Sequence, residues 1–190
     1  RGGFPSIVMR LSKDDPELSE VDLSGQGIDD AQVQELVGAL AGNTHVRVMK
    51  LAGNGFSGES AALLASAIFD NVDLRSAVKV DDPRIQHVLV SKKIERVAAN
   101  EDGLTRVDLR GATDAHPPAL AAALKTNTRV ATLDLRDNGG ITAAGRRALV
   151  GMLRANTGVR AIDLGWCPGI RKGLREEIER LAKDQDRWLA

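Results

Sequence analysis

Apolar positions along the chain follow a short pattern that recurs at nearly constant spacing. Two residues separate the first apolar position from the second, and one separates the second from the third, as in Leu18-Ser-Glu-Val21-Asp-Leu23. Copies of the pattern start at Leu18, Val46, Leu104, Val130 and Val159. The stretch from Leu74 to Val80 fits with one extra residue before its second apolar position. The chain is therefore built from about six repeats, of which the third is irregular.

Within each repeat the apolar spacing changes from two residues to nearly four, which is typical of a strand followed by a helix. In the first repeat Val21 and Leu23 lie on the predicted strand. The predicted helix then carries an apolar stripe of Val33, Leu36, Val37 and Leu40. The same columns recur in the later helices, where only Lys93 interrupts one of them. A slight rotation of that helix would bring Ile94 into its place.

Asparagine marks the end of the repeats. Asn43, Asn71, Asn100, Asn127 and Asn156 are separated by 28, 29, 27 and 29 residues. We expect each of them just past a helix end, in a left-handed backbone conformation that asparagine tolerates better than most residues. Asn54 and Asn138 stand at a second shared position, after the strands. There we expect a buried asparagine that bonds backbone groups of a turn.

This strand-helix unit is the pattern of a leucine-rich repeat. A single repeat leaves its apolar face open, so stacked repeats share one core, with parallel strands inside a short right-handed arc and helices outside. The predicted fold class is α/β, a leucine-rich repeat βα solenoid. We expect an N-terminal cap at residues 1–17, repeats at 18–169 and a C-terminal capping helix at 170–190. That helix has an apolar stripe of Ile170, Leu174, Ile178 and Leu181.

Charge and cysteine content narrow the classes of function. Lysine plus arginine (26) equals aspartate plus glutamate (26), so the whole chain has no net field that would draw it to nucleic acid or to an acidic membrane. No apolar run approaches the roughly 20 residues that span a bilayer. The single cysteine, Cys167, forms no internal disulfide, which favours a reducing, cytoplasmic compartment. The chain starts at Arg1 without a methionine, which leaves open whether it is a fragment of a longer protein.

Motifs that suggest chemistry have simpler structural interpretations. The stretch Gly53-Asn-Gly55-Phe-Ser-Gly58 matches GxGxxG between a strand and a helix, which is the context of a dinucleotide site. Gly25 and Gly27 hold the same two places in the first repeat, so a turn explains these glycines without a cofactor. The histidines fall at different positions of three repeats, so the sequence predicts no metal site and no catalytic triad. They are His45, His87 and His116.

The sheet surface that faces away from the helices is the candidate functional site. The middle residue of each LxL strand points away from the core, and charged neighbours extend the surface. We predict that this concave face contains Asp22, Arg47, Lys50, Arg106, Asp108, Arg110, Asp134, Arg136, Arg160, Asp163 and Trp166. Patterned charge selects protein partners, but charged residues on this face can equally serve only to keep the sheet soluble. For Trp166 and Trp188, a binding anchor and packing of the cap both remain open.

Several stretches resemble a known family. The chain contains Asp15-Pro16-Glu-Leu18-Ser-Glu20-Val21-Asp22-Leu23, then Asn43-Thr-His-Val46, Asn127-Thr-Arg-Val130 and Asn156-Thr-Gly-Val159. The repeat length resembles the ribonuclease-inhibitor class of leucine-rich repeats. The stretches are similar to the tropomodulin and leiomodin repeat domain, whose first repeat begins with Asp-Pro-x-Leu-x-Glu-Val-x-Leu and whose helices end in Asn-Thr-x-Val. This resemblance implies binding of actin at the pointed end of filaments. Tropomodulins also carry a long N-terminal half, whereas about 17 residues precede the repeats here.

The sequence thus favours a non-enzymatic protein-interaction module. Its partner would be another protein, with actin and other cytoskeletal proteins among the candidates, and we expect no cofactor, metal, nucleic acid or membrane. Tropomodulin-like capping of actin pointed ends is the narrower alternative. A nucleotide-binding or enzymatic domain is the remote alternative, and it would require a pocket with convergent titratable groups.

Overall fold

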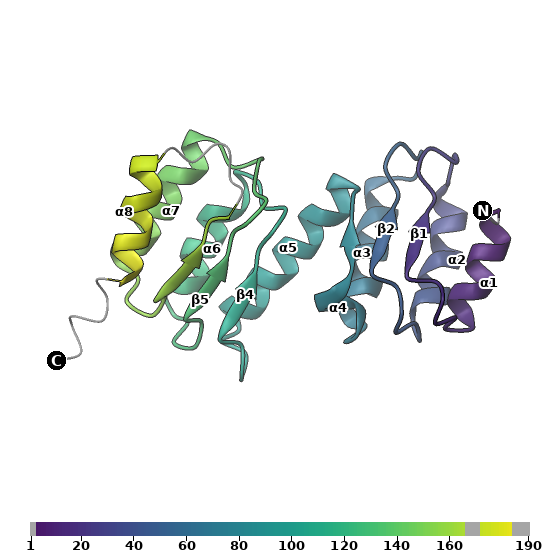
Figure 1. The fold of residues 1–190 in the computed structure, drawn as a ribbon, viewed down its shortest axis with the longest axis horizontal. Helices are drawn as coiled ribbons and strands as arrows, with labels where there is room; N and C mark the ends of the chain where they lie inside the picture. The colour runs from purple at the N-terminus through teal and green to yellow at the C-terminus, as the bar shows by residue number, and fades with distance from the viewer. Residues whose placement is uncertain (1–2, 166–171, 184–190) are drawn as a thin grey trace. The chain divides into compact units, whose positions relative to one another are not determined.

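The structure, a computed structural model, describes residues 3–165 and 172–183. The chain divides into two compact units, Arg1–Leu89 (unit 1) and Val90–Ala190 (unit 2). Each unit holds a parallel sheet of three strands, with helices packed on one side of it (Figure 1). The predicted fold class, an α/β chain of alternating strands and helices with parallel strand pairing, is confirmed.

Unit 1 contains the first three strands. In chain order its elements are α1 (Phe4–Ser12), β1 (Glu20–Asp22), α2 (Asp30–Leu40), β2 (Val48–Lys50), α3 (Gly58–Asp70), α4 (Leu74–Ala77) and β3 (Lys79–Val80). The strand order is β1-β2-β3, with Val21 opposite Met49 and Met49 opposite Val80. In the third repeat the four-residue helix α4 directly precedes the two-residue strand β3. The extra residue seen in the sequence pattern lies in this short helix.

Unit 2 contains the other three strands. The helix α5 (Pro83–Ala98) crosses the boundary, and β4 (Arg106–Asp108), α6 (His116–Leu124), β5 (Thr132–Asp134), α7 (Ala143–Ala155), β6 (Ala161–Asp163) and α8 (Lys172–Lys183) follow. The register aligns Val107 with Leu133 and Leu133 with Ile162. Asp108, Asp134 and Asp163 are therefore direct neighbours on the other side of the sheet.

The apolar columns predicted for the helices are buried. Three residues before each asparagine stand Leu40, Ile68, Val97, Leu124 and Leu153, all in the core. Seven residues before it stand Leu36, Leu64, Leu120 and Leu149, which are buried as well. Lys93 is half-buried in this column, and Ile94 beside it is 5% exposed. The predicted rotation of this helix is confirmed.

The asparagine series stabilises the stacking through side chains, and the predicted left-handed backbone is wrong for four of its five members. Among the described residues only Asn100 of the series has a positive φ, of 52°. In Asn127 the Nδ2 group donates to the carbonyl of Val97 at 2.8 Å, and Oδ1 accepts from the backbone N–H of Val130 at 2.8 Å. Asn43, Asn71 and Asn156 make the same two kinds of bond, one to the end of the preceding helix and one to the backbone N–H three residues later. Each of these asparagines thus connects its repeat to the element stacked before it, which is the cap helix α1 for Asn43.

The second asparagine position behaves as predicted in the first unit. Asn54 Nδ2 donates to the carbonyls of Leu23 and Leu51, each at 2.8 Å, and its Oδ1 accepts from the N–H of Ile28. Asn138 Oδ1 accepts from the N–H of Ala112 at 2.7 Å, while its buried Nδ2 has no partner among the described residues. An asparagine therefore satisfies turn groups in both repeats, and it is half-buried at Asn54 and buried at Asn138.

A helix closes each end of the described chain. Phe4, Ile7 and Leu11 of α1 are buried against the core of unit 1. In α8, Ile178 is 1% exposed and belongs to the core of unit 2. Ile170 and the side chain of Leu174 lie outside the described residues. The predicted C-terminal helix is confirmed between Lys172 and Lys183.

Candidate functional site

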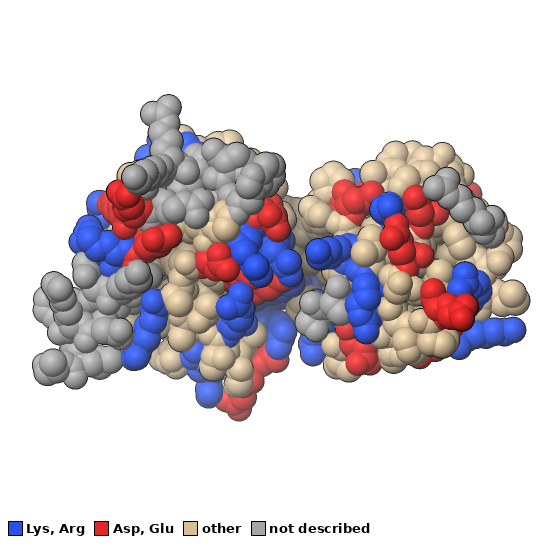
Figure 2. Space-filling view, viewed as in Figure 1, with Lys and Arg blue, Asp and Glu red and all other residues tan. Residues whose placement is uncertain are grey.

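The outward side of the sheet in unit 2 carries six of the predicted site residues. Val107 and Leu133 are buried against the helices, so the residues beside them point to the opposite side. We call this surface the arginine face, and it consists of Arg106, Asp108, Arg110, Asp134, Arg136 and Asp163. In Figure 2 basic and acidic side chains are interleaved on the visible side of both units.

Each aspartate of this face ends its strand. Asp108 Oδ1 accepts from the backbone N–H of Arg110 at 3.0 Å, and Asp134 Oδ1 accepts from that of Arg136 at 3.2 Å. Asp163 does the same for Gly165 at 3.0 Å. A carboxylate that bonds the N–H two residues later favours a turn over further strand. The aspartate column thus has a structural role in every repeat of unit 2.

The carboxylates also hold arginines in a fixed geometry. Arg110 approaches Asp108 side-on, with Nε 3.0 Å from Oδ1 and Nη2 2.6 Å from Oδ2. Arg136 approaches Asp134 in the same way, at 2.9 Å and 2.6 Å. Paired N–H donors on one carboxylate fix the plane of a guanidinium. The two arginines occupy the same place in adjacent repeats, two residues after the aspartate.

Asp134 lies at the centre of this network. Arg106 adds a bond from Nη2 to Asp134 Oδ2 at 2.9 Å, and the Nε of Arg136 lies 3.3 Å from Asp163. With arginines above it, Asp134 is only 2% exposed, although it stands on the outward side of the sheet. Hydrogen bonds from the side chain and backbone of Arg136, and then from Arg106, lower the pKa of Asp134 to about 2. Its part in binding stays a prediction.

Lys93 joins this cluster, although the sequence analysis did not include it in the site. It interacts electrostatically with Asp108, Arg110 and Asp134, and burial lowers its pKa. The available signal was its position, since it is the one charged residue in an apolar helix column. The positive charge of Lys93 thus adds to that of the arginines around Asp108 and Asp134.

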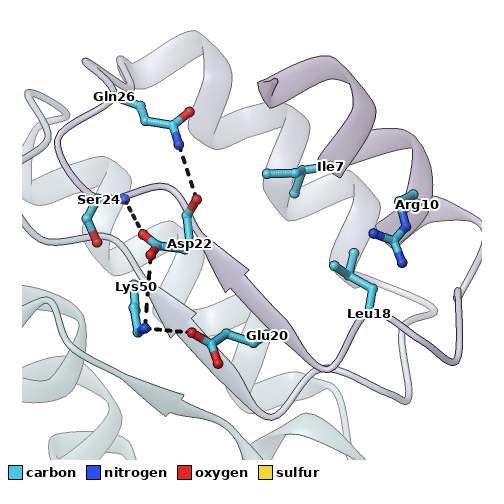
Figure 3. A pocket seen from close by; sticks show the side chains of 8 residues that line it. All are labelled: Ile7, Arg10, Leu18, Glu20, Asp22, Ser24, Gln26 and Lys50. Atoms are coloured by element: carbon cyan, nitrogen blue, oxygen red, sulfur yellow. Dashed lines mark hydrogen bonds and ion pairs between the residues drawn. The ribbon is translucent and has the colours of Figure 1, made fainter. Parts of the chain in front are cut away.

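Unit 1 presents a different surface beside its first strand (Figure 3). An open groove of about 550 Å³ is lined by Ile7, Arg10, Leu18, Glu20, Asp22, Ser24, Gln26 and Lys50. Lys50 Nζ lies 2.6 Å from Glu20 Oε1 and 4.0 Å from Asp22 Oδ2. The hydrogen bond that Lys50 donates to Glu20 is the main reason that the pKa of Lys50 is raised. The structure thus brings together Asp22 and Lys50, two of the predicted site residues, and places Glu20 beside them.

The other predicted site residues that the structure describes are Arg47 and Arg160. Arg47 is exposed before β2, and its Nη1 group donates to the carbonyls of Thr44 and Val46. Arg160 is exposed before β6. Trp166 lies outside the described residues, as do Cys167 and Trp188.

The glycines of the GxGxxG stretch serve a turn. Gly53 has a φ of 75° and Gly25 one of 61°, a region that favours glycine. A side chain on Gly53 would approach the backbone of Gly25 to 3.6 Å. The start of α3 is capped by the chain itself, because Ser57 Oγ accepts from the N–H of Ser60.

The described residues form neither a metal site nor a membrane-spanning helix. No group of three or more histidine, cysteine, aspartate or glutamate residues in the described part of the chain is arranged to hold a metal ion. None of the helices formed by the described residues combines the length and apolar character needed to cross a bilayer.

Comparison with known proteins identifies the repeat. The family model described as Leucine Rich repeat matches residues 126–150, which contain β5 and the first part of α7. No curated protein matches the chain. Among solved structures the chain is similar to leiomodin-1 actin-binding site 2, with 18% identity over 100% of this chain and 93% of that chain and a TM-score of 0.38. It is also similar to the tropomodulin C-terminal domain of Caenorhabditis elegans, with 12% identity over 99% and 96% and a TM-score of 0.38. The family match thus identifies one leucine-rich repeat at residues 126–150, and likeness at these identities assigns no activity.

Proposed function

We propose that this leucine-rich repeat chain is a non-enzymatic module that binds another protein through the outward sides of its sheets. The arginine face of unit 2 is the observation that carries the proposal. Its charged side chains stand on short paired strands and are fixed by hydrogen bonds to one another. A rigid surface loses little side-chain entropy when a partner binds, which favours recognition.

The variation between repeats supports recognition over solubility alone. The core columns repeat almost unchanged, whereas the residue that follows the LxL strand is Ser24, Ala52, Arg110, Arg136 or Gly165. A face that served only solubility would need charge in every repeat, without a particular order. Here the arginines are confined to two adjacent repeats, which gives the surface a local identity.

Photo-cross-linking tests this proposal with a matched pair of alanines. Ala161 on β6 faces outward from the sheet and is exposed, and Ala122 on α6 is exposed on the helical side. A photoreactive amino acid at Ala161 should capture a discrete protein in cells, and the same probe at Ala122 should not. Equal capture at both positions, or capture only at Ala122, would contradict binding through the sheet.

Tropomodulin-like binding of actin is the second candidate, favoured by the stretch from Asp15 to Leu23. That stretch forms the turn into the first strand, since Asp15 accepts from Arg10 Nε and from the N–H of Glu17. The test is elongation of actin filaments whose fast-growing ends are blocked, together with co-sedimentation. Inhibition at micromolar concentration would support this partner. The absence of both inhibition and co-sedimentation would exclude it.

We extend the proposal to a cytoplasmic location without a cofactor. A lone cysteine, Cys167, suits a reducing compartment. Retention in the cytoplasm after fluorescent tagging of the protein would support this location.

A further inference from the structure

We infer that the arginine face of unit 2 binds an acidic protein segment that offers at least two carboxylate side chains. This inference rests on the proposed function and names the chemistry of the partner. The site would be formed by Arg106, Arg110 and Arg136, with Lys93 at its side.

The side-on pairing leaves part of each guanidinium available. Arg110 and Arg136 use Nε and Nη2 for their own aspartates. The Nη1 groups of both have no hydrogen-bond partner among the residues that the structure describes. A guanidinium has five N–H donors in a plane, so a second carboxylate can bind at the end that the first leaves open.

Exposure favours the arginines over the carboxylates as contact groups. The side chains of Arg106 and Arg136 are 54% and 41% exposed, whereas the Asp134 carboxylate that holds them is 3% exposed. A partner therefore meets guanidinium groups, with the compensating negative charge beneath them. Because the buried carboxylate already fixes their orientation, the arginines lose little freedom on binding.

The spacing suits two carboxylates of one segment. Arg110 and Arg136 follow β4 and β5, and adjacent strands lie about 4.8 Å apart. Alternate side chains of an extended peptide point the same way and are separated by roughly 6.6 Å. Flexible glutamate side chains on alternate residues can thus reach both arginines.

The charge of the whole unit attracts the same kind of partner. Val90–Ala190 contains 18 basic and 13 acidic residues, a formal charge of +5, while Arg1–Leu89 contains 8 and 13, a formal charge of −5. A positive unit draws acidic segments toward its surface and raises the rate of association. The zero net charge of the chain hides this division.

A run of phosphates is a poorer fit than separate carboxylates. The side chains of Asp108 and Asp163 are 32% and 44% exposed among the arginines. Nucleic acid presents a continuous line of negative charge, which would meet these two aspartates as well as the arginines. Separate carboxylates can bind the arginines and avoid the aspartates.

The test uses two labelled peptides and fluorescence anisotropy with the whole chain. One peptide alternates serine with glutamate, and its control carries glutamine in place of each glutamate. We expect the glutamate peptide to bind at least about tenfold tighter than the glutamine peptide, with affinity that falls between about 50 mM and about 300 mM NaCl. Equal binding of both peptides would overturn the inference.

Two variants with the same change of net charge locate the site. Arg110→Gln removes a guanidinium from the face, and Asp108 beneath it stays partly hydrated. Arg129→Gln removes an arginine of the same unit that pairs with Asp102. We expect Arg110→Gln to weaken the glutamate peptide at least about fivefold and Arg129→Gln less than about twofold. Equal loss in both variants would mean unspecific charge attraction and would overturn the site.

NMR spectroscopy of the arginine side chains detects the same contact and needs no variant that could unfold. The Nε–Hε signals of Arg110 and Arg136 should shift on addition of the glutamate peptide and stay in place with the glutamine peptide. Unchanged signals, tighter binding of a single-stranded DNA of similar charge, or a dimer at physiological salt that Arg110→Gln dissociates would each overturn the acidic segment as occupant.

The outcome is separable from that of the proposed function. The probe at Ala161 can capture a protein whose affinity changes neither with salt nor with Arg110→Gln. In that case the module binds a partner, but the inference of an acidic segment is wrong. If that probe captures nothing while the glutamate peptide still binds the arginines, the chemistry of the face holds and the proposed function fails.

Discussion

Aspartate at the middle of an LxL strand has two roles in this chain. In every case that the structure describes on β1, β4, β5 and β6, Oδ1 accepts the N–H two residues later and ends the strand. At Asp134 the carboxylate is also covered by Arg106 and Arg136 and leaves the solvent. The Asp-Leu-Arg order at 108–110 and 134–136 is visible in the sequence. Which arginine folds over which carboxylate depends on pairing between strands, so residue order alone does not reveal it.

Asp134→Ala should destabilise the chain by about 1 to 3 kcal/mol, because it removes charge-assisted bonds to two arginines around a buried site. Asp22→Ala is the matched control, since its side chain is 44% exposed and it ends a strand in the same way. We expect it to lower the free energy of unfolding by less than about 1 kcal/mol. Urea unfolding measures both. Equal losses of unfolding free energy in the two variants would mean that the arginine network adds nothing to the hydrogen bond with which each aspartate ends its strand.

Acid should weaken the fold through the same carboxylate. The folded pKa of Asp134 is about 2 and the unfolded value is 3.8, so its contribution is complete above pH 4 and disappears as the pH falls toward 2. The difference in unfolding free energy between wild type and Asp134→Ala should therefore shrink by roughly 2 kcal/mol over that range. Urea titrations at several pH values measure this difference. A difference that stays constant would place the pKa at its ordinary value.

At the scale of elements, helix starts depend on the repeat before them. Asp114 precedes α6, yet its carboxylate accepts from the backbone N–H groups of Thr142 and Gly145 at the start of α7. Asp30 at the start of α2 accepts from the N–H of Ser57 before α3 in the same way. An anionic side chain at a helix N-terminus satisfies free N–H groups and favours the helix dipole. Neighbouring helices are thus connected through their first turns.

Alanine substitutions at two glycines of α7 distinguish the effect of this contact on stability from the effect of helix propensity. A methyl group on Gly145 would lie 2.4 Å from Asp114 Oδ1 and 2.9 Å from Ile141 Cγ2, whereas Gly151 has open space. Gly151→Ala should stabilise the chain by about 0.5 to 1 kcal/mol. Gly145→Ala should instead destabilise it by about 1 to 2 kcal/mol, because the cap is displaced. Thermal unfolding gives both signs, and stabilisation by Gly145→Ala would show that the cap is dispensable.

Most elements could be predicted because their signals are periodic. The apolar columns fixed which side of each helix is buried, and Ile94 replaced Lys93 as expected. The role of the asparagines was not predictable in the same way. A left-handed residue and a side chain that bonds the preceding repeat both favour asparagine at a helix end, and only the geometry of Asn127 and Val97 distinguishes them. The charged face was located by strand alternation, but Lys93 reaches it from a helix.

At the scale of the whole molecule, the net charge of zero does not show that acidic and basic residues are unevenly distributed along the chain. Equal totals of acidic and basic residues suggested a chain without an electrostatic preference. The unit boundary divides these residues into an acidic and a basic part, and charge asymmetry between halves is a recognised sign of an interaction surface. The boundary follows from the contacts of the folded chain, so composition alone could not place it.

Opposite charge on the two units should make copies of the chain attract each other at low salt. We expect the second virial coefficient at pH 7 to become more positive when NaCl is raised from about 20 mM to about 300 mM, as screening weakens the attraction. Static light scattering measures it, with sucrose at equal osmolarity as the uncharged control. A coefficient that falls with salt would mean that like charge dominates.

The hydrogen bonds of the asparagines also follow the order in which the chain is synthesised. In Asn43, Asn71, Asn127 and Asn156 the donor comes later in the chain than the carbonyl it reaches, as with Asn43 and Leu11 or Asn156 and Leu124. During synthesis on the ribosome, the acceptor has therefore already left the exit tunnel when its asparagine appears. Each new repeat can add to one that is complete, which suits growth of the fold from the N-terminus and keeps exposed apolar surface brief.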